Sequence, residues 1–431
     1  MDYSFAKEID GFREDIDSIN SAVPVCMVLL TGICKAGQKE LGEMKNKYAL
    51  SRKRVGDLEQ ITFKRAHRAS AFESKLKELH EYVTALELLP KTFLVSLISQ
   101  YDAFVGRLVR SVFYQRPEVL KASEKVITYP ELMSHSSFKQ AKEHLIDKEV
   151  EDLLRESHTK HFLWLENKLN MSLRKDLDVW PDFIEVTERR NLFVHCDGVV
   201  SRQYLNVCEE HGVVFEKKPK VGERLDVTPD DFAKAYRTVL EIGIKLGHVL
   251  WRKLLPSEVS DADKQFNLTC VELIEREQYN VAEKLLLLAK SEFARRSSEE
   301  IKLYCKFNLA QTYKWQGKNQ DCKNILSSIE VANLSHKYQL ADAVLRDDFE
   351  KAAQIMKQAG KKGEVQPLEY HKWPLFKEFR KTELFSKTYA AVFGEPFRIE
   401  ARPIGKQVQK LTKKKTKAKK AKRKKKGRRP Q

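Results

Sequence analysis

Residues 91–115 read KTFLVSLISQYDAFVGRLVRSVFYQ, and this stretch decides the fold class. Its apolar side chains recur every three or four residues, which places them on one broad face of an α-helix. They are Phe93, Leu94, Leu97, Ile98, Tyr101, Phe104, Val105, Leu108, Val109 and Val112. A face this wide predicts a helix buried against several others, ending before Pro117.

The helical period continues on both sides of this stretch. Upstream, a stripe formed by Phe72, Leu76, Leu79, Val83 and Leu86 is typical of core packing or a short coiled coil. That helix is expected to end at Pro90, because proline lacks the N–H that a helix interior needs.

Downstream, we expect helices at about 138–155, 159–171 and 181–194. A further helix should run from Thr228, which is a good N-cap followed by proline, to about Leu255. Between these helices, 213–215 and 225–227 flank a turn-rich segment and predict a short strand pair. The fold class is therefore all-α.

From about Asn267 the pattern changes to helix pairs with weak internal similarity. Aligning Ala282, Cys322 and Ala352 gives steps of 40 and 30 residues and brings apolar residues into register four and seven positions later. The pattern resembles the tetratricopeptide repeat, which packs small residues where its two helices touch. The resemblance implies an array of helical hairpins with a peptide or protein partner.

The net charge of +18 is concentrated at one end of the chain. Residues 401–431 contain 16 Lys or Arg and no acidic residue, so the first 400 residues sum to only +2. We expect this tail to be disordered and to attract RNA or other polyanions; a solubility tail and a nuclear address are the alternatives. Its nucleic-acid-binding candidates are Lys413, Lys414, Lys415, Lys417, Lys419, Lys420, Lys422, Arg423, Lys424, Lys425, Lys426, Arg428 and Arg429.

The composition also bears on the compartment. The apolar run Val23 to Cys34 is too short for a membrane span and follows an acidic segment, so we expect a cytoplasmic protein without a membrane anchor. Seven cysteines without paired spacing indicate reduced thiols. We expect no metal and no cofactor.

One segment combines residues that suit phosphate chemistry. Arg190 is followed by Asn191 and then by His195, and Asp197-Gly198 should end the helix directly afterwards. Arginine binds phosphate through a fixed, charged fork, and histidine transfers protons near neutral pH. The spacing alone is uninformative, because Arg155 and His161 share it in a polar segment that we interpret, with His158, as surface helix.

Residues 183–205 resemble the signature region of the HEPN family, named for higher eukaryotes and prokaryotes nucleotide-binding. Its motif is an arginine, a polar residue and a histidine four to six positions later, which Arg190, Asn191 and His195 match. Asp102 is the best positional match to an acid that the family places beside this motif. The resemblance implies a helical bundle with a long helix after the motif, which residues 91–256 would supply.

The resemblance also implies a metal-independent endoribonuclease. His195 would deprotonate the ribose 2′-hydroxyl or protonate the leaving oxygen, while Arg190 would stabilise charge on the phosphorane. Asn191 would orient the phosphate or the histidine. A role in stress, as a toxin or in antiviral defence follows from analogy with the family.

Helix geometry adds a constraint on this motif. At about 100° per residue, positions 190 and 195 lie about 140° apart on a straight helix, so one ideal helix cannot aim both side chains alike. Fraying at Asp197-Gly198 or the pairing of two copies would bring them together. We expect a homodimer whose two motifs line one cleft.

Two alternatives stay open at this point. Arg190 and His195 could bond Glu185 or Asp102 and simply hold the bundle together. The protein could also be a non-catalytic nucleic-acid-binding or scaffold protein that uses the helical array and the tail. The predicted organisation is an N-terminal helical region (1–90), a HEPN-like domain (91–256), a helical array (257–400) and a basic tail (401–431).

Overall fold

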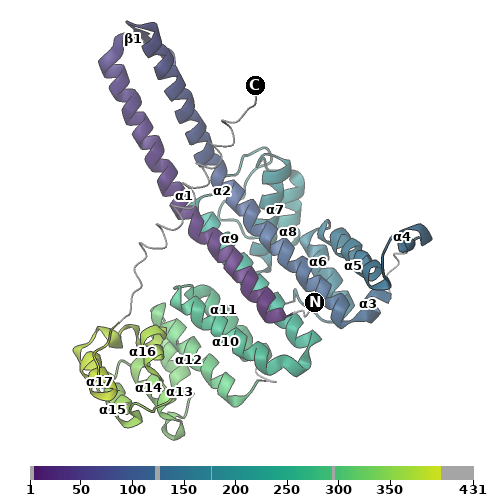
Figure 1. Cartoon of the computed structure of the whole chain (residues 1–431), viewed down its shortest axis with the longest axis vertical. Helices are drawn as coiled ribbons and strands as arrows, with labels where there is room; N and C mark the ends of the chain where they lie inside the picture. The colour runs from purple at the N-terminus through teal and green to yellow at the C-terminus, as the bar shows by residue number, and fades with distance from the viewer. Residues whose placement is uncertain (1–3, 122–126, 176, 294–296, 399–431) are drawn as a thin grey trace, which may run out of the picture. The chain divides into compact units, whose positions relative to one another are not determined.

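The computed structural model describes residues 4–121, 127–175, 177–293 and 297–398, and most of them are helical (Figure 1). The chain divides into two compact units, residues 1–309 and 310–431. The prediction of an all-α fold is confirmed. The two strands within the described residues are β1 (Ala49–Val55) and β2 (Leu58–Phe63).

The first unit contains eleven complete α-helices within its described residues. They are α1 (Phe5–Tyr48), α2 (Ala66–Gln115), α3 (Pro117–Lys121), α4 (Tyr129–Met133), α5 (Phe138–Leu154), α6 (His158–Leu169), α7 (Trp180–His195), α8 (Arg202–Glu210), α9 (Pro229–Leu254), α10 (Val259–Glu275) and α11 (Tyr279–Leu288). Those that follow are α12 (Glu299–Trp315), α13 (Asn319–Ser327), α14 (His336–Leu345), α15 (Phe349–Ala359), α16 (Pro367–Lys372) and α17 (Glu383–Phe393).

The centre of the first unit is a close contact among α1, α2 and α9. Phe12 of α1 stacks on Phe104 of α2 with ring centroids 4.4 Å apart, and both rings are fully buried. On α9, a Cβ added at Gly243 would overlap the Phe12 ring, and one at Gly247 would lie 2.8 Å from Cγ1 of Ile9. Residues four apart share a helix face, so the two glycines open one groove for α1.

Helix α9 begins as the sequence predicts. The Thr228 side chain accepts from the N–H of Asp231, and the Asp231 carboxylate accepts from the N–H of Thr228 at 2.9 Å. This capping box satisfies N–H groups that the first turn would otherwise leave unpaired. The helix then packs against α1, α2 and α7.

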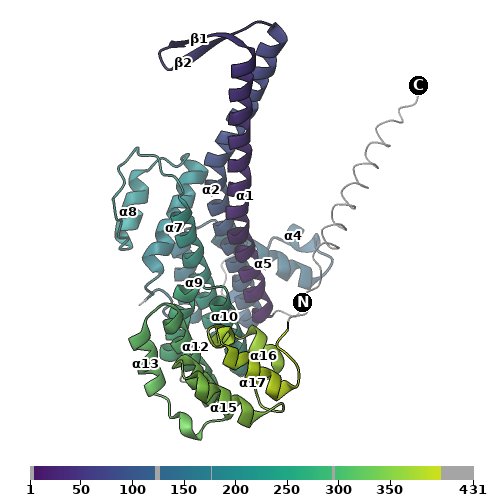
Figure 2. The same ribbon diagram turned by 90° about the vertical axis from the view of Figure 1, so that its left-hand side faces the viewer.

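Beyond the bundle, α1 and α2 continue side by side as a long arm that carries the β-hairpin at its far end (Figures 1 and 2). The prediction of a helix end at Pro90 is wrong, because α2 runs through Pro90 to Gln115. Apolar contacts on both sides, by Leu86 and Leu94, offset the roughly 3 kcal/mol cost of an interior proline. The expected boundary at residue 90 therefore falls inside one continuous helix.

The two helices of the arm are also long and apolar enough to be compared with membrane-spanning helices. Helices α1 and α2 each contain an 18-residue window long and apolar enough to cross a membrane by length and composition. In α1 only 6% of that window is buried, and Val25, Val28, Leu29 and Ile33 are exposed. The apolar run from Val23 to Cys34 was expected to be too short to span a membrane, but α1 contains an apolar window of 18 residues. Core helices of soluble proteins, which are mostly buried, and signal sequences near an N-terminus have the same length and composition.

The positions of the strands differ from the prediction. Residues 213–215 and 225–227 form no strand pair, and the nearby pairing is a single bridge between Val199 and Arg224. Val213, Phe215 and Leu225 instead pack on a cluster around Tyr204, which satisfies them without a sheet. The hairpin of β1 and β2 escaped the sequence analysis, although Gly56-Asp57 between two β-rich segments is a turn signal.

The helix pairs expected from residue 267 are observed as α10 with α11, α12 with α13 and α14 with α15. Each pair turns at a residue with positive φ, which is Glu277, Gly317 or Asp347. The residue after each of them donates its N–H to the carbonyl five positions earlier, at 2.8–2.9 Å. The aligned small residues Ala282, Cys322 and Ala352 are all buried. The polybasic tail predicted at 401–431 lies outside the described residues.

The contact at Gly243 generates a stability prediction. Gly243→Ala should lower the free energy of unfolding by about 1–3 kcal/mol, because the methyl group meets the buried Phe12 ring. Gly11→Ala is the matched control: nothing lies within 4 Å of its Cβ, so better helix propensity should raise stability by about 0.5–1 kcal/mol. Thermal unfolding followed by circular dichroism measures both, and a stable Gly243→Ala variant would contradict the close-packing account.

Candidate functional site

Helix α7 places the predicted motif at its C-terminal end. Asp197 and Gly198 adopt φ of 50° and 76°, and the N–H groups of Cys196 and Gly198 donate to the carbonyl of Leu192 at 2.8 and 2.9 Å. This left-handed turn ends the helix, as the Asp-Gly pair predicts. His195 is consequently the last residue of α7, and its side chain is exposed.

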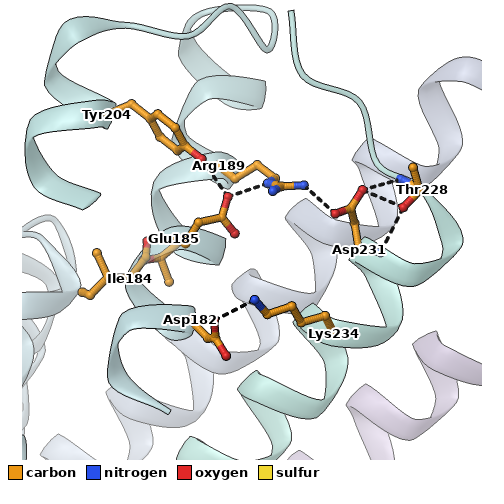
Figure 3. A network of polar contacts seen from close by, with 9 residues as sticks. Asp182, Ile184, Glu185, Arg189, Tyr204, Thr228, Asp231 and Lys234 are labelled. Carbon is orange, nitrogen blue, oxygen red and sulfur yellow. Dashed lines mark hydrogen bonds and ion pairs between the residues drawn. The ribbon is translucent and has the colours of Figure 1, made fainter. Parts of the chain in front are cut away.

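On one side of α7, a network of hydrogen bonds and ion pairs connects this helix to its neighbours (Figure 3). Glu185 accepts hydrogen bonds from Nε of Arg189 and from the hydroxyl of Tyr204, each at 2.7 Å. Arg189 also reaches Asp231 of α9 at 3.1 Å. Burial and the neighbouring Glu185 raise the pKa of Tyr204, so its hydroxyl remains a donor at neutral pH. The network ties α7 to α8 and α9, and it occupies Arg189 rather than Arg190.

The adjacent side of α7 meets Asp102 of α2. Oδ1 of Asp102 lies 2.8 Å from Nε2 of His158, and Oδ2 lies 3.5 Å from Nη2 of Arg190. Nη1 of Arg190 also donates to Oδ1 of Asn191 at 3.1 Å. The Asp102 carboxylate of α2 thus contacts one group from α6 and one from α7. The predicted residues Asp102, Arg190 and Asn191 are brought together, and Asp102 rather than Glu185 pairs with Arg190.

These groups open onto a cleft with a volume of about 410 Å³. Asp102, His158, Arg190, Asn191 and His195 all line it, together with Glu188, Gln203 of α8 and Ser201, the N-cap of that helix. In the described part of the chain, His195 makes no hydrogen bond and Nε of Arg190 is a buried donor with no acceptor. The cleft therefore combines an exposed imidazole with a partly buried guanidinium.

Arg190 and His195 reach this cleft from a single chain. The long Arg190 side chain, braced on Asn191, turns toward Asp102, while His195 stands at the end of the helix. The angular separation on the helix is overcome by side-chain length. Convergence of the motif does not require a second copy, and the homodimer stays a prediction.

His158 and His161 are the clearest error of the sequence analysis. They were predicted on a surface helix, but their residues are only 7% and 2% exposed. His158 packs edge-on against Phe183 with ring centroids 5.5 Å apart. A signal existed, since His158, His161, Phe162, Leu165 and Leu169 share the buried face of α6 at helical spacing. Arg155, by contrast, is exposed as expected.

Burial also shifts two neighbouring titratable groups. Burial raises the pKa of Glu188, which accepts from Nδ2 of Asn191 at 3.3 Å. Burial, aided by the nearby His158, lowers the pKa of His161 to about 4. His161 is therefore neutral near pH 7. It is buried in the core and does not line the cleft.

No known protein family, curated protein or solved structure matches this chain. Functional inference therefore depends on the chemistry and the geometry of the cleft.

His161 generates a pH prediction. Its pKa is about 4 in the folded chain against 6.5 for an ordinary histidine, so the unfolded state binds more protons between those pH values and stability falls as pH drops through that window. His161→Gln should reduce this slope by on the order of 1 kcal/mol per pH unit. Urea unfolding from pH 4 to 7 measures it, with the exposed His336→Gln as control; equal slopes in all three proteins would contradict the assignment.

Proposed function

We propose that this protein is an endoribonuclease that cleaves RNA by attack of the ribose 2′-hydroxyl, without a metal ion. The observation that carries the proposal is the convergence of Asp102, His158, Arg190 and His195 on one cleft from three helices. Two imidazoles and one guanidinium are a sufficient set of groups for this reaction.

The reaction needs two proton transfers. A neutral imidazole takes the proton of the 2′-hydroxyl as the 2′-oxygen bonds to phosphorus, and a protonated imidazole gives a proton to the leaving 5′-oxygen as its bond to phosphorus breaks. The products are a 2′,3′-cyclic phosphate and a 5′-hydroxyl. His195 is exposed in the cleft and takes one role; His158 is the candidate for the other, as the imidazole that sequence analysis missed.

Arg190 supplies charge for the phosphorane. Its guanidinium has five donors, of which one pairs with Asp102 and one with Asn191, so donors remain for phosphate oxygens. Asp102 acts on both partners, because one carboxylate oxygen orients His158 and the other holds Arg190. Asp102 is thus a positioning residue, and Asn191 positions Arg190 beside it.

A binding or scaffold protein is the second candidate function. The ion pair of Arg190 and the hydrogen bond of His158 with Asp102 are also contacts that a purely structural cluster would make. In that case the helical hairpins would recruit a peptide or protein partner and the tail would hold nucleic acid.

The remaining parts of the proposal rest on the resemblance to the HEPN family and on composition. They are a homodimer, a cytoplasmic location, a tetratricopeptide-like array and a role in stress, as a toxin or in antiviral defence. Sedimentation of the purified chain tests the dimer directly.

His195→Ala should lower the rate of RNA cleavage about 10²–10⁴-fold, because it removes a proton-transfer group. Arg190→Lys should lower it by about 10²-fold, since a single ammonium cannot replace the fork. His336→Ala, an exposed histidine of α14, is the control and should leave the rate unchanged. Gel-based cleavage of a labelled RNA measures all three.

His195→Ala and the unmodified chain together separate the candidate functions. RNA binding retained by His195→Ala with cleavage lost supports the enzyme, whereas absence of cleavage by the unmodified chain supports the scaffold. Loss of cleavage in chelator, or products with a 3′-hydroxyl, would overturn the proposed mechanism.

His158→Gln tests the second proton-transfer role. The glutamine amide reaches the position from which Nε2 of His158 contacts Asp102 but cannot transfer a proton, so kcat should fall while KM changes little. One limb of the pH profile of kcat should also disappear. An unchanged pH profile would make His158 a structural residue.

Deletion of residues 406–431 tests the tail. Since this segment is rich in Lys and Arg, its loss should weaken RNA binding and flatten the dependence of affinity on salt. Fluorescence anisotropy at several salt concentrations measures both quantities. Unchanged affinity for RNA would show that the tail does not contribute to RNA binding.

A further inference from the structure

The far end of the arm is an ordered structure in its own right. Cys34, Leu41, Phe72 and Leu79 form a buried cluster between α1 and α2, and Ile61 and Phe63 of β2 pack against it. Phe63 and Phe72 lie with ring centroids 5.3 Å apart. The β-hairpin is therefore fixed to the helices, although an isolated two-stranded hairpin is only marginally stable.

This end of the arm is strongly basic. Residues 45–68, which we call the arm tip, contain eight Lys or Arg against Asp57 and Glu59. Residues 1–400 sum to a charge of +2, and the arm tip alone contributes 8 − 2 = +6. The other residues of 1–400 are therefore net negative. The arm tip is thus a local positive patch that no sequence motif had indicated.

Most of this charge is not neutralised within the arm tip. Lys45 pairs with Glu59, Arg52 donates to the amide oxygen of Asn46 at 2.8 Å, and the Arg68 guanidinium lies 4.3 Å from the centre of the Tyr48 ring. Among the described residues, Lys53, Lys64 and Arg65 are exposed and have no carboxylate partner. Their charge is available to an external polyanion.

The hairpin presents cations on both of its faces. Arg52 and Arg54 point to one side of β1 and Lys53 to the other, and all of β1 after Ala49 is exposed. We propose that the arm tip binds the sugar-phosphate backbone of RNA at a site remote from the cleft. The choice of RNA rests on the proposed ribonuclease function. An anionic lipid surface is the competing polyanion, because Leu50, Val55 and Leu58 are exposed beside these cations, and the test below includes it as an outcome that overturns the proposal.

The distance between the cleft and the arm tip sets the minimum length of an RNA that contacts both. Asp102, at the cleft, and Ala66, at the arm tip, lie on the same helix α2, about 54 Å apart at 1.5 Å per residue. An RNA duplex is A-form and rises less per base pair than the about 3.4 Å of B-form DNA, so an RNA that reaches both sites needs more than about 16 base pairs. The arm tip therefore selects long substrates and adds nothing for short ones.

The test is a charge-removal variant in the full-length chain. Lys53→Ser, Lys64→Ser and Arg65→Ser together remove three exposed cations that have no carboxylate partner, and they keep the Lys45 to Glu59 pair and the Arg68 to Tyr48 contact. Serine is also a preferred N-cap at position 65, where α2 begins. The matched control removes three exposed lysines of the second unit, with Lys357→Ser, Lys361→Ser and Lys362→Ser.

All proteins carry His195→Ala so that RNA is not consumed, and all retain the tail, whose contribution then cancels. The arm-tip variant should bind an RNA duplex of about 24 base pairs at least about tenfold more weakly than the control variant. Its plot of log Kd against log salt should be shallower by about 2–3. Binding of an RNA of about four nucleotides should not change.

Equal affinity of the two variants for the long RNA would overturn the proposal. So would a loss confined to duplex DNA of the same length, or a loss of binding to anionic phosphatidylserine vesicles with RNA affinity intact. Cleavage is measured separately on chains with His195. A chain that never cleaves but loses long-RNA binding in the arm-tip variant would refute the ribonuclease and leave the arm tip as an RNA-binding site.

Discussion

The groove that Gly243 and Gly247 open on α9 is the contact on which the rest of the first unit depends. It admits Phe12 and Ile9 of α1 to a depth that any side chain at these positions would prevent. Phe12 in turn stacks on Phe104 of α2, so the same contact sets the spacing of three long helices. The position of Asp102, two residues before Phe104, is fixed as a consequence.

Asp102 joins this packing to the cleft. It lies on the central helix α2, and its two oxygens contact His158 of α6 and Arg190 of α7. Helix α7 is held independently on its other side by the network of Glu185, Arg189, Tyr204 and Asp231. A cleft built on helices with such support keeps its groups in place, which the proposed proton transfers would require.

The arm extends the same two helices beyond the bundle. Because α1 and α2 are continuous from the core to the arm tip, the position of the arm tip relative to the cleft is determined by helix geometry rather than by a linker. An exposed basic hairpin at one end and a cleft at the other would let one RNA contact both. Substrate length would then contribute to selection.

Local periodicity and caps are enough to predict the helical character, the ends of α5, α6, α7 and α9 and the helix pairs after α9. An acid beside Arg190 was expected only from the resemblance to the HEPN family, with Glu185 and Asp102 both open. Pro90 and the histidines of α6 show the limit. Whether a proline ends a helix, or a histidine faces solvent, depends on contacts with residues distant in sequence. Only the tertiary structure decided that α2 passes through Pro90, that His158 meets Asp102 and that Arg190 and His195 share one cleft within a single chain, since long-range packing sets all three.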